Sequence, residues 1–115
     1  MIEIETENGH HEYLYSIQDV AQVLKLKMPD GRRVGRNLLF KILQYNKILQ
    51  KNNLLYENWL NFGWGVTHIT VKNHKSYLMP TLTEKGISVL KAGIASGRYQ
   101  IQIEKTIEVT TELPF

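Results

Sequence analysis

The sequence predicts an α+β domain with three short helices, one β-hairpin and an additional long C-terminal strand. Three observations support this fold class. Apolar residues recur at helical spacing in three segments, each preceded by a residue that can cap a helix. Two extended runs flank a short polar turn, as they do in a hairpin. From residue 99 to residue 113 the chain alternates apolar and polar residues, without glycine or proline.

The composition is that of one ordinary globular domain. The chain has 115 residues, of which 43% are hydrophobic and 22% are charged. It has no cysteine, which excludes a disulfide framework, thiolate zinc sites and a cysteine nucleophile. Its start lacks the apolar core of a signal peptide, and no apolar run approaches the roughly 20 residues of a membrane span. We therefore expect a single cytoplasmic domain over residues 1–115, with no membrane partner.

Positive charge is concentrated in one third of the chain. Residues 16–53 carry eight basic and two acidic residues, a net charge of +6, although the whole chain carries only +3. Residues 1–15 carry four glutamates and no lysine or arginine. Clustered positive charge is typical of a surface that binds nucleic acid, and the alternative is an ordinary solvated helix face.

A capping box predicts a first helix that begins after Ser16. The Ser16 hydroxyl can accept a hydrogen bond from the backbone of Asp19, and the Asp19 carboxylate can accept one from the backbone of Ser16. Tyr15 and Val20 stand at the positions of a hydrophobic staple. The buried face then consists of Ile17, Val20, Ala21 and Leu24.

A Pro-Asp-Gly turn at residues 29–31 separates this helix from a second one, predicted over residues 36–45. Gly35 is an acceptable N-cap, and we expect Asn46 to end the helix in a left-handed conformation. The apolar side of the helix consists of Leu38, Leu39, Ile42 and Leu43. The polar side consists of Asn37, Lys41 and Gln44, at the spacing i, i+4, i+7.

The segment over residues 50–63 has no clear period. Its large apolar residues are expected to pack inside, and they are Leu54, Leu55, Trp59 and Phe62. Two strands over residues 64–72 and 77–82 then form the predicted hairpin, around a turn at residues 73–76. Pro80 in the second strand indicates an edge or a bulge.

The third helix is predicted to begin after Thr83, which is a good N-cap, and to end at Gly97. The alternating segment that follows has one apolar face, and residues 1–5 show a similar, shorter pattern. A long strand needs a partner, because an unpaired edge exposes backbone donors and acceptors. We expect residues 98–115 to form a strand that pairs within the chain or with a second copy, and the second case gives a homodimer.

Helix, turn, helix, hairpin and helix, in this order, are the layout of a winged helix-turn-helix domain. We assign the winged-helix core to residues 13–97 and the strand-forming tail to residues 98–115. In such a domain the second helix, about ten residues long, fits the major groove of duplex DNA. The hairpin is then the wing.

Nine residues are candidates for contact with double-stranded DNA. Asn37 and Gln44 suit bidentate pairing with adenine, and Lys41 can donate to guanine. Arg36 lies in the first helical turn, where a phosphate would also meet the free backbone N–H groups. The cations expected to hold the phosphate backbone are Arg32, Arg33, Lys47, Lys72 and Lys75, and the first two could instead enter a minor groove. The alternative for every candidate is a solvated position that binds nothing.

The sequence predicts no catalysis, cofactor or metal ion. It contains no Gly-rich phosphate loop and no nucleophile–base motif. His10 and His11 are adjacent and cannot share a helical face, and His68 and His74 have no partners at ligand spacing. We therefore expect a binding protein rather than an enzyme.

Five stretches stand out by their order and spacing, and they span about residues 13–93. They are YSIQDVAQVL, GRNLLFKIL, KILQKNNLLYENW, NFGWGV and LTEKGISVLKAG. Together they resemble the KilA C-terminal (KilAC) domain family of phage antirepressors. The resemblance implies a winged helix-turn-helix fold, a bacteriophage or prophage origin, DNA binding and a role in transcription regulation in the host cytosol. The family's motif also points to Gly35, Arg36 and Asn37 at the start of the reading helix.

Two functional hypotheses follow from these patterns. The first is a phage-type, antirepressor-like regulatory domain that recognises duplex DNA through the helix at residues 36–45 and the hairpin wing. The second is an adaptor that binds a repressor protein, or self-associates, without contacting DNA. The apolar face of the tail favours some protein contact, so both hypotheses stay open at this stage.

Overall fold

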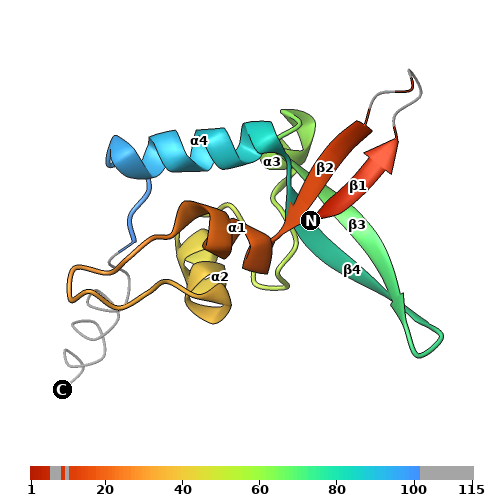
Figure 1. Cartoon of the computed structure of the whole chain (residues 1–115), viewed down its shortest axis with the longest axis horizontal. Helices are drawn as coiled ribbons and strands as arrows, with labels where there is room; N and C mark the ends of the chain where they lie inside the picture. Colours follow the sequence, from red (N-terminus) through yellow and green to blue (C-terminus); the bar gives the residue numbers. More distant parts are fainter. Residues whose placement is uncertain (6–8, 10, 102–115) are drawn as a thin grey trace.

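The computed structural model describes residues 1–5, 9 and 11–101, and their fold is α+β, as the sequence predicts (Figure 1). Four strands form an antiparallel sheet in the order β1-β2-β4-β3. The strands are β1 (Ile2–Glu5), β2 (His11–Ser16), β3 (Gly65–Lys72) and β4 (Lys75–Leu82). The helices are α1 (Ile17–Leu24), α2 (Arg36–Tyr45), α3 (Glu57–Asn61) and α4 (Glu84–Ala95). Strand β2 and the short helix α3 are the elements that the sequence did not predict.

The first and last helices begin where the sequence predicts. Ser16 accepts a hydrogen bond from the Asp19 backbone at 3.2 Å, and the Asp19 carboxylate accepts one from the Ser16 backbone at 3.1 Å. The Thr83 hydroxyl accepts a hydrogen bond from the backbone N–H of Gly86 at 3.0 Å, which caps α4. Gly97 follows the last turn of α4 with a φ of +83°. Each cap involves residues only a few positions apart, so sequence alone identifies it.

Helix α2 has the predicted bounds, but it ends differently. Asn46 keeps a φ of −85°, and Lys47 takes the left-handed conformation instead, with a φ of +58°. The prediction of a left-handed Asn46 is therefore wrong. The physical reason is the Asn46 side chain, whose amide donates to the carbonyls of Ile42 and Gln100, at 2.8 Å each. These bonds cap α2 and fix the segment that follows α4.

Residues 25–35 connect α1 to α2. The predicted turn is present, because the Gly31 N–H donates to the Met28 carbonyl at 2.9 Å. An isolated bridge also pairs Lys27 with Arg33, so the connection is itself a small hairpin. It is longer than the roughly three- to four-residue turn of most helix-turn-helix motifs.

Strands β3 and β4 form a long hairpin in an unbroken register, from Gly65 opposite Leu82 to Lys72 opposite Lys75. Asn73 and His74 make the turn, with φ values of +51° and +64°. Positive φ at both central residues is the geometry of a type I′ turn, whose twist matches that of the strands. Strand β4 therefore starts two residues earlier than predicted.

The hairpin contains no bulge at Pro80, which pairs in register with Thr67. Strand β4 pairs with β2 through only two residues, Leu82 and Thr81, so Pro80 lies directly beyond that pairing. A residue without an N–H is suited to this position. Of the two alternatives that the sequence left open at Pro80, the structure has the edge and not the bulge, because the sheet divides into two hairpins here.

The core lies where the helices meet the base of the sheet (Figure 1). Its most deeply buried side chains include Ile17, Val20, Leu39, Ile42, Leu43, Leu49, Leu82 and Leu90. Trp59 on α3 is also buried, as predicted. The same prediction is wrong for Phe62, which is 59% exposed and stacks on Trp64 with 4.7 Å between the ring centres. The chain reverses at Gly63, so Phe62 covers Trp64 from the outside.

The segment after α4 is not a strand over residues 98–101. Tyr99 packs there near Trp59, with 6.4 Å between ring centres, and its N–H donates to the carbonyl of Gly93 at 3.0 Å. The prediction of a strand is thus wrong for these first residues. Residues 102–115, which carry most of the predicted strand, lie outside the described part of the chain.

Candidate nucleic-acid interface

Helix α2 presents one polar side to solvent, as its pattern predicts. Arg36, Asn37 and Lys41 are exposed. The opposite side packs into the core through Leu39, Ile42 and Leu43. Both sides follow from the 3.6-residue period of the helix. The first half of the predicted reading helix is therefore accessible to a ligand.

The first turn of α2 carries Arg36, and neighbouring side chains orient it. The Arg36 guanidinium lies 4.7 Å from the centre of the Phe40 ring, and its Nη1 donates to Oδ1 of Asn37 at 3.2 Å. Gly35 is the N-cap and offers no side chain to the backbone N–H groups of this turn. A helix start with free N–H groups and an adjacent guanidinium suits an anionic oxygen.

The three arginines between residues 32 and 36 differ in their surroundings. Nε of Arg32 donates to the carboxylate of Asp30 at 2.6 Å. The backbone N–H of Arg32, and then its guanidinium, lower the pKa of Asp30 below its ordinary value. Asp30 thus offsets much of the charge of Arg32. Arg33 and Arg36 are exposed, and neither forms an ion pair with a carboxylate of the described residues.

A groove of about 730 Å³ lies between α1 and the start of α2. Its apolar lining consists of Ala21, Leu26, Val34 and Leu38. Its uncharged polar lining consists of Gln18, Gln22 and Asn37, together with Gly35. Three cations complete it, and they are Lys25, Arg33 and Arg36. No carboxylate of the described residues belongs to the lining, so the groove is electropositive.

The far end of α2 is less accessible than predicted. Gln44 is half-buried, and its Nε2 donates to Oδ1 of Asn53 at 2.5 Å. Its amide is therefore bound to the loop after the helix rather than displayed beside Lys41. Lys47 is exposed directly beyond α2. The structure thus brings Arg33, Arg36 and Asn37 together around one groove and holds Gln44 apart from them.

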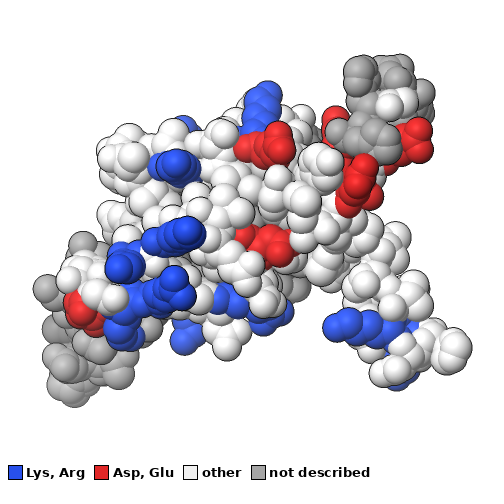
Figure 2. Space-filling view, viewed as in Figure 1, with Lys and Arg blue, Asp and Glu red and all other residues white. Residues whose placement is uncertain are grey.

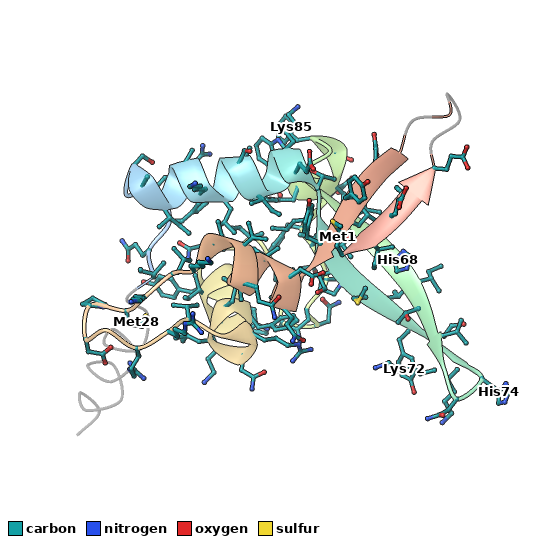
Figure 3. The ribbon with its side chains drawn as sticks, in the orientation of Figure 1. Met1, Met28, His68, Lys72, His74 and Lys85 are labelled. Atoms are coloured by element: carbon teal, nitrogen blue, oxygen red, sulfur yellow. The ribbon has the colours of Figure 1, made fainter. Side chains whose placement is uncertain are left out.

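The lysines of the predicted wing stand at the tip of the β3–β4 hairpin. Lys72 and Lys75 flank the turn and pair in register, and both are exposed. Lys72 and His74 lie at the end of the hairpin that points away from α2 (Figure 3). Figure 2 shows two concentrations of positive charge, one around the α1–α2 connection and one at the hairpin tip. Lys72 and Lys75 therefore do not form one compact cluster with the α2 arginines.

Sequence reasoning missed the contribution of α1 to this surface. Gln18, Gln22 and Lys25 line the groove, although none of them was a predicted contact. The signal was present, because these residues recur at the spacing i, i+4, i+7 and so share one side of a helix. Only the packing of α1 on α2 shows that this side faces Arg36.

The described residues offer little other chemistry. Within them, no three histidine, aspartate or glutamate side chains come together as a group that could hold a metal ion. None of the helices in this part of the chain has the length and apolar content needed to cross a membrane. Comparison with models of known protein families, with curated proteins and with solved structures gives no match.

Proposed function

We propose that this chain is a winged-helix domain of the phage regulatory type that binds duplex DNA through α2. The observation that carries the proposal is the groove at the start of α2, which is lined by Lys25, Arg33 and Arg36 and by no carboxylate of the described residues. A long hairpin after α3 takes the place of the wing. The α1–α2 connection is an extended form of the usual turn, and the domain acts by binding rather than by catalysis.

Each part of the surface has a separate role in this proposal. Phosphate oxygens lie at the groove, where the cations and the free N–H groups of α2 hold the register of the duplex. Asn37 and Lys41 then reach base edges, since they are exposed on the same side of α2. Lys72 and Lys75 contact the phosphate backbone further along the duplex. The proposal assigns no base contact to Gln44 as long as its amide stays bound to Asn53.

The first test is selection from a random duplex library at two salt concentrations, because sequence-specific and non-specific binding separate there. Enrichment of one motif at both concentrations supports a sequence-specific regulator. Binding without enrichment reduces the proposal to a non-specific DNA-binding protein. Absence of binding even at low salt would overturn it.

The second test assigns the surface with matched variants. Arg33→Ala/Arg36→Ala removes two charges from the groove, and Lys85→Ala/Lys91→Ala removes two exposed charges from α4. Lys85 lies beside α4, at the edge of the molecule away from α2 (Figure 3). Each phosphate contact contributes roughly 0.9 to the slope of log K against log salt. We expect the groove variant to lose about 1.8 of this slope and the α4 variant to keep it.

An adaptor without DNA contact is the second candidate function. It is favoured by the β3–β4 hairpin, where large apolar side chains are exposed. Such side chains suit a protein surface better than a phosphate backbone. An adaptor would bind its repressor or a second copy equally well before and after the loss of Arg33 and Arg36. The same variant therefore separates the two functions.

A further inference from the structure

The sheet divides into two arms that point away from the helices. The first arm is the β1–β2 hairpin and the second is the β3–β4 hairpin (Figure 1). The arms are joined only where Tyr15 pairs with Leu82 and Ser16 pairs with Thr81. Beyond this junction the two arms diverge like the branches of a fork at one end of the molecule (Figure 1).

The two arms carry opposite charge. Glu3, Glu5 and Glu12 lie on the first arm, and the sequence has no lysine or arginine before Lys25. Lys72 and Lys75 lie on the second arm, which contains no acidic residue. Figure 2 shows the acidic side chains gathered over the first arm and the basic ones at the tip of the second. Charge of each sign is therefore segregated on a separate branch.

The second arm also exposes apolar side chains on one face. Ile69 and Leu78 are directly opposite each other in the register, and Val71 is two residues further along β3, so the three share a face. They are 62%, 57% and 66% exposed, respectively. Large aliphatic side chains at adjacent positions on a projecting hairpin are typical of a surface that another protein covers.

We propose that the forked end of the molecule is a self-association surface whose partner is a second copy of this chain. If a second copy is rotated by a half-turn about the viewing axis of Figure 2, its acidic arm lies below its basic arm. When its forked end is then placed against that of the first copy, the acidic arm of each copy meets the basic arm of the other. The contact is isologous, and both charge pairings form at once. The proposal also places the Ile69 face of each copy against its partner.

Charge complementarity within one chain is the reason for choosing a second copy as the occupant. A different partner would have to present both an acidic and a basic branch at the same spacing, whereas a second copy does so by symmetry. Three aliphatic side chains a side are fewer than the roughly 20–30 residues a side of a standard interface. We therefore expect a weak dimer whose association depends on protein concentration and weakens as salt screens the arms.

Sedimentation velocity of the full chain, over a range of concentrations at low and high salt, tests the proposal. Lys72→Glu/Lys75→Glu makes both arms acidic, and Glu5→Lys/Glu12→Lys makes both arms basic. Each variant alone should self-associate at least tenfold more weakly than the wild type. An equimolar mixture of the two should recover the dimer, because every acidic arm then meets a basic one.

Two further variants complete the experiment. Ile69→Thr/Leu78→Thr should also weaken the dimer at least tenfold, while thermal unfolding confirms that the exposed substitutions leave the fold intact. Lys85→Glu/Lys91→Glu reverses charge on α4, away from the arms, and should leave association unchanged. A wild type that is monomeric at every concentration would overturn the proposal. A mixture of the two charge variants that stays monomeric would also overturn it. So would a dimer that persists in both charge variants, which is the result expected if residues 102–115 form the interface instead. The dimer and the duplex would compete for Lys72 and Lys75, because the same two lysines serve both contacts. The sedimentation outcomes are measured without DNA, so none of them depends on whether the protein binds it.

Discussion

The replacement Gly86→Ala should destabilise the domain, although alanine is the better helix former. Gly86 lies in the first turn of α4, where a Cβ atom would stand 1.7 Å from the carbonyl oxygen of Trp64 and 2.7 Å from its carbonyl carbon. That oxygen already accepts a hydrogen bond from the N–H of Thr83, the N-cap of α4. The neighbour is backbone, so it cannot rotate away as a side chain could. Either α4 or the start of β3 must shift.

The sign of the effect follows from three opposing magnitudes. Alanine gains about 1 kcal/mol over glycine in a helix. Overpacking a fixed site costs typically 1–3 kcal/mol, and a shift of α4 also stretches the Thr83–Trp64 hydrogen bond, worth about 1 kcal/mol. The cost exceeds the gain, and we expect a net loss of about 2 kcal/mol in the free energy of unfolding. For a chain of 115 residues that is a fall in Tm of roughly 8 °C.

Urea unfolding followed by tryptophan fluorescence measures this loss, and α4 supplies two controls. At Gly93 the added Cβ would stand 2.2 Å from Cδ2 of the Tyr99 ring, which is a side chain and can turn aside. Gly93→Ala should therefore cost less than Gly86→Ala. Ser88→Ala, at an exposed position of the same helix, should be neutral or slightly stabilising. If Gly86→Ala proved as stable as Ser88→Ala, the close approach of α4 to Trp64 would be refuted.

Two further predictions concern the ends of the chain. The N-terminal ammonium of Met1 binds the Asp19 carboxylate at 2.6 Å, and this bond, with those from Ser16, lowers the pKa of Asp19 below its ordinary 3.8. A carboxylate whose pKa is lower in the folded state stabilises the fold at a pH above its unfolded-state pKa, and this stabilisation is lost as the pH falls through the folded-state pKa. The Tm measured below pH 4 should therefore fall less in Asp19→Asn, which cannot lose this stabilisation, than in the wild type. Asn46→Ala should lower the free energy of unfolding by about 1–2 kcal/mol, because the Asn46 side chain both donates to and accepts from the backbone of Gln100. The same loss should speed tryptic cleavage after Arg98, and equal cleavage rates in the variant and the wild type would contradict this.

The parts of the fold that sequence predicts well are those fixed by near neighbours. Ser16 and Thr83 cap helices through bonds to residues three positions away. The hairpin turn is also predicted near its true place, although it consists of Asn73 and His74 alone rather than of residues 73–76. The failures are positions where a distant segment decides. Strand β2 has no strong pattern of its own and is extended because β1 and β4 pair with it. The Asn46 side chain is hydrogen-bonded to the backbone carbonyl of Gln100, which is 54 positions away in sequence.

The same distinction between local and long-range contacts decides which parts of the candidate interface could be predicted from the sequence. The amphipathic period of α2 correctly predicts that Asn37 and Lys41 are exposed, because that period is local. The groove beside them could not be predicted, since it exists only where Gln22 of α1 packs near Arg36. Sequence also could not predict which arginine is offset by a carboxylate, because this depends on the turn that brings Asp30 to Arg32.

Gln44 gives the sharpest test of whether local pattern or tertiary contact decides what α2 displays. Its period places it with Asn37 and Lys41, whereas the structure binds its amide to Asn53. If the bond persists in the complex, Gln44→Ala should change affinity for a selected duplex less than twofold. Asn37→Ala should then lower affinity at least fivefold, since a bidentate base contact is worth about 1–3 kcal/mol.

Asn53→Gly is the matched partner variant, because Asn53 has a φ of +65° that glycine adopts without strain. Removing either end of one hydrogen bond should cost about 0.5–1 kcal/mol in urea unfolding, and the double variant should cost little more than one of them. If Gln44→Ala weakened DNA binding tenfold while Asn53→Gly strengthened it, Gln44 would leave the loop to contact a base, and the period of the helix would be the better guide to its function.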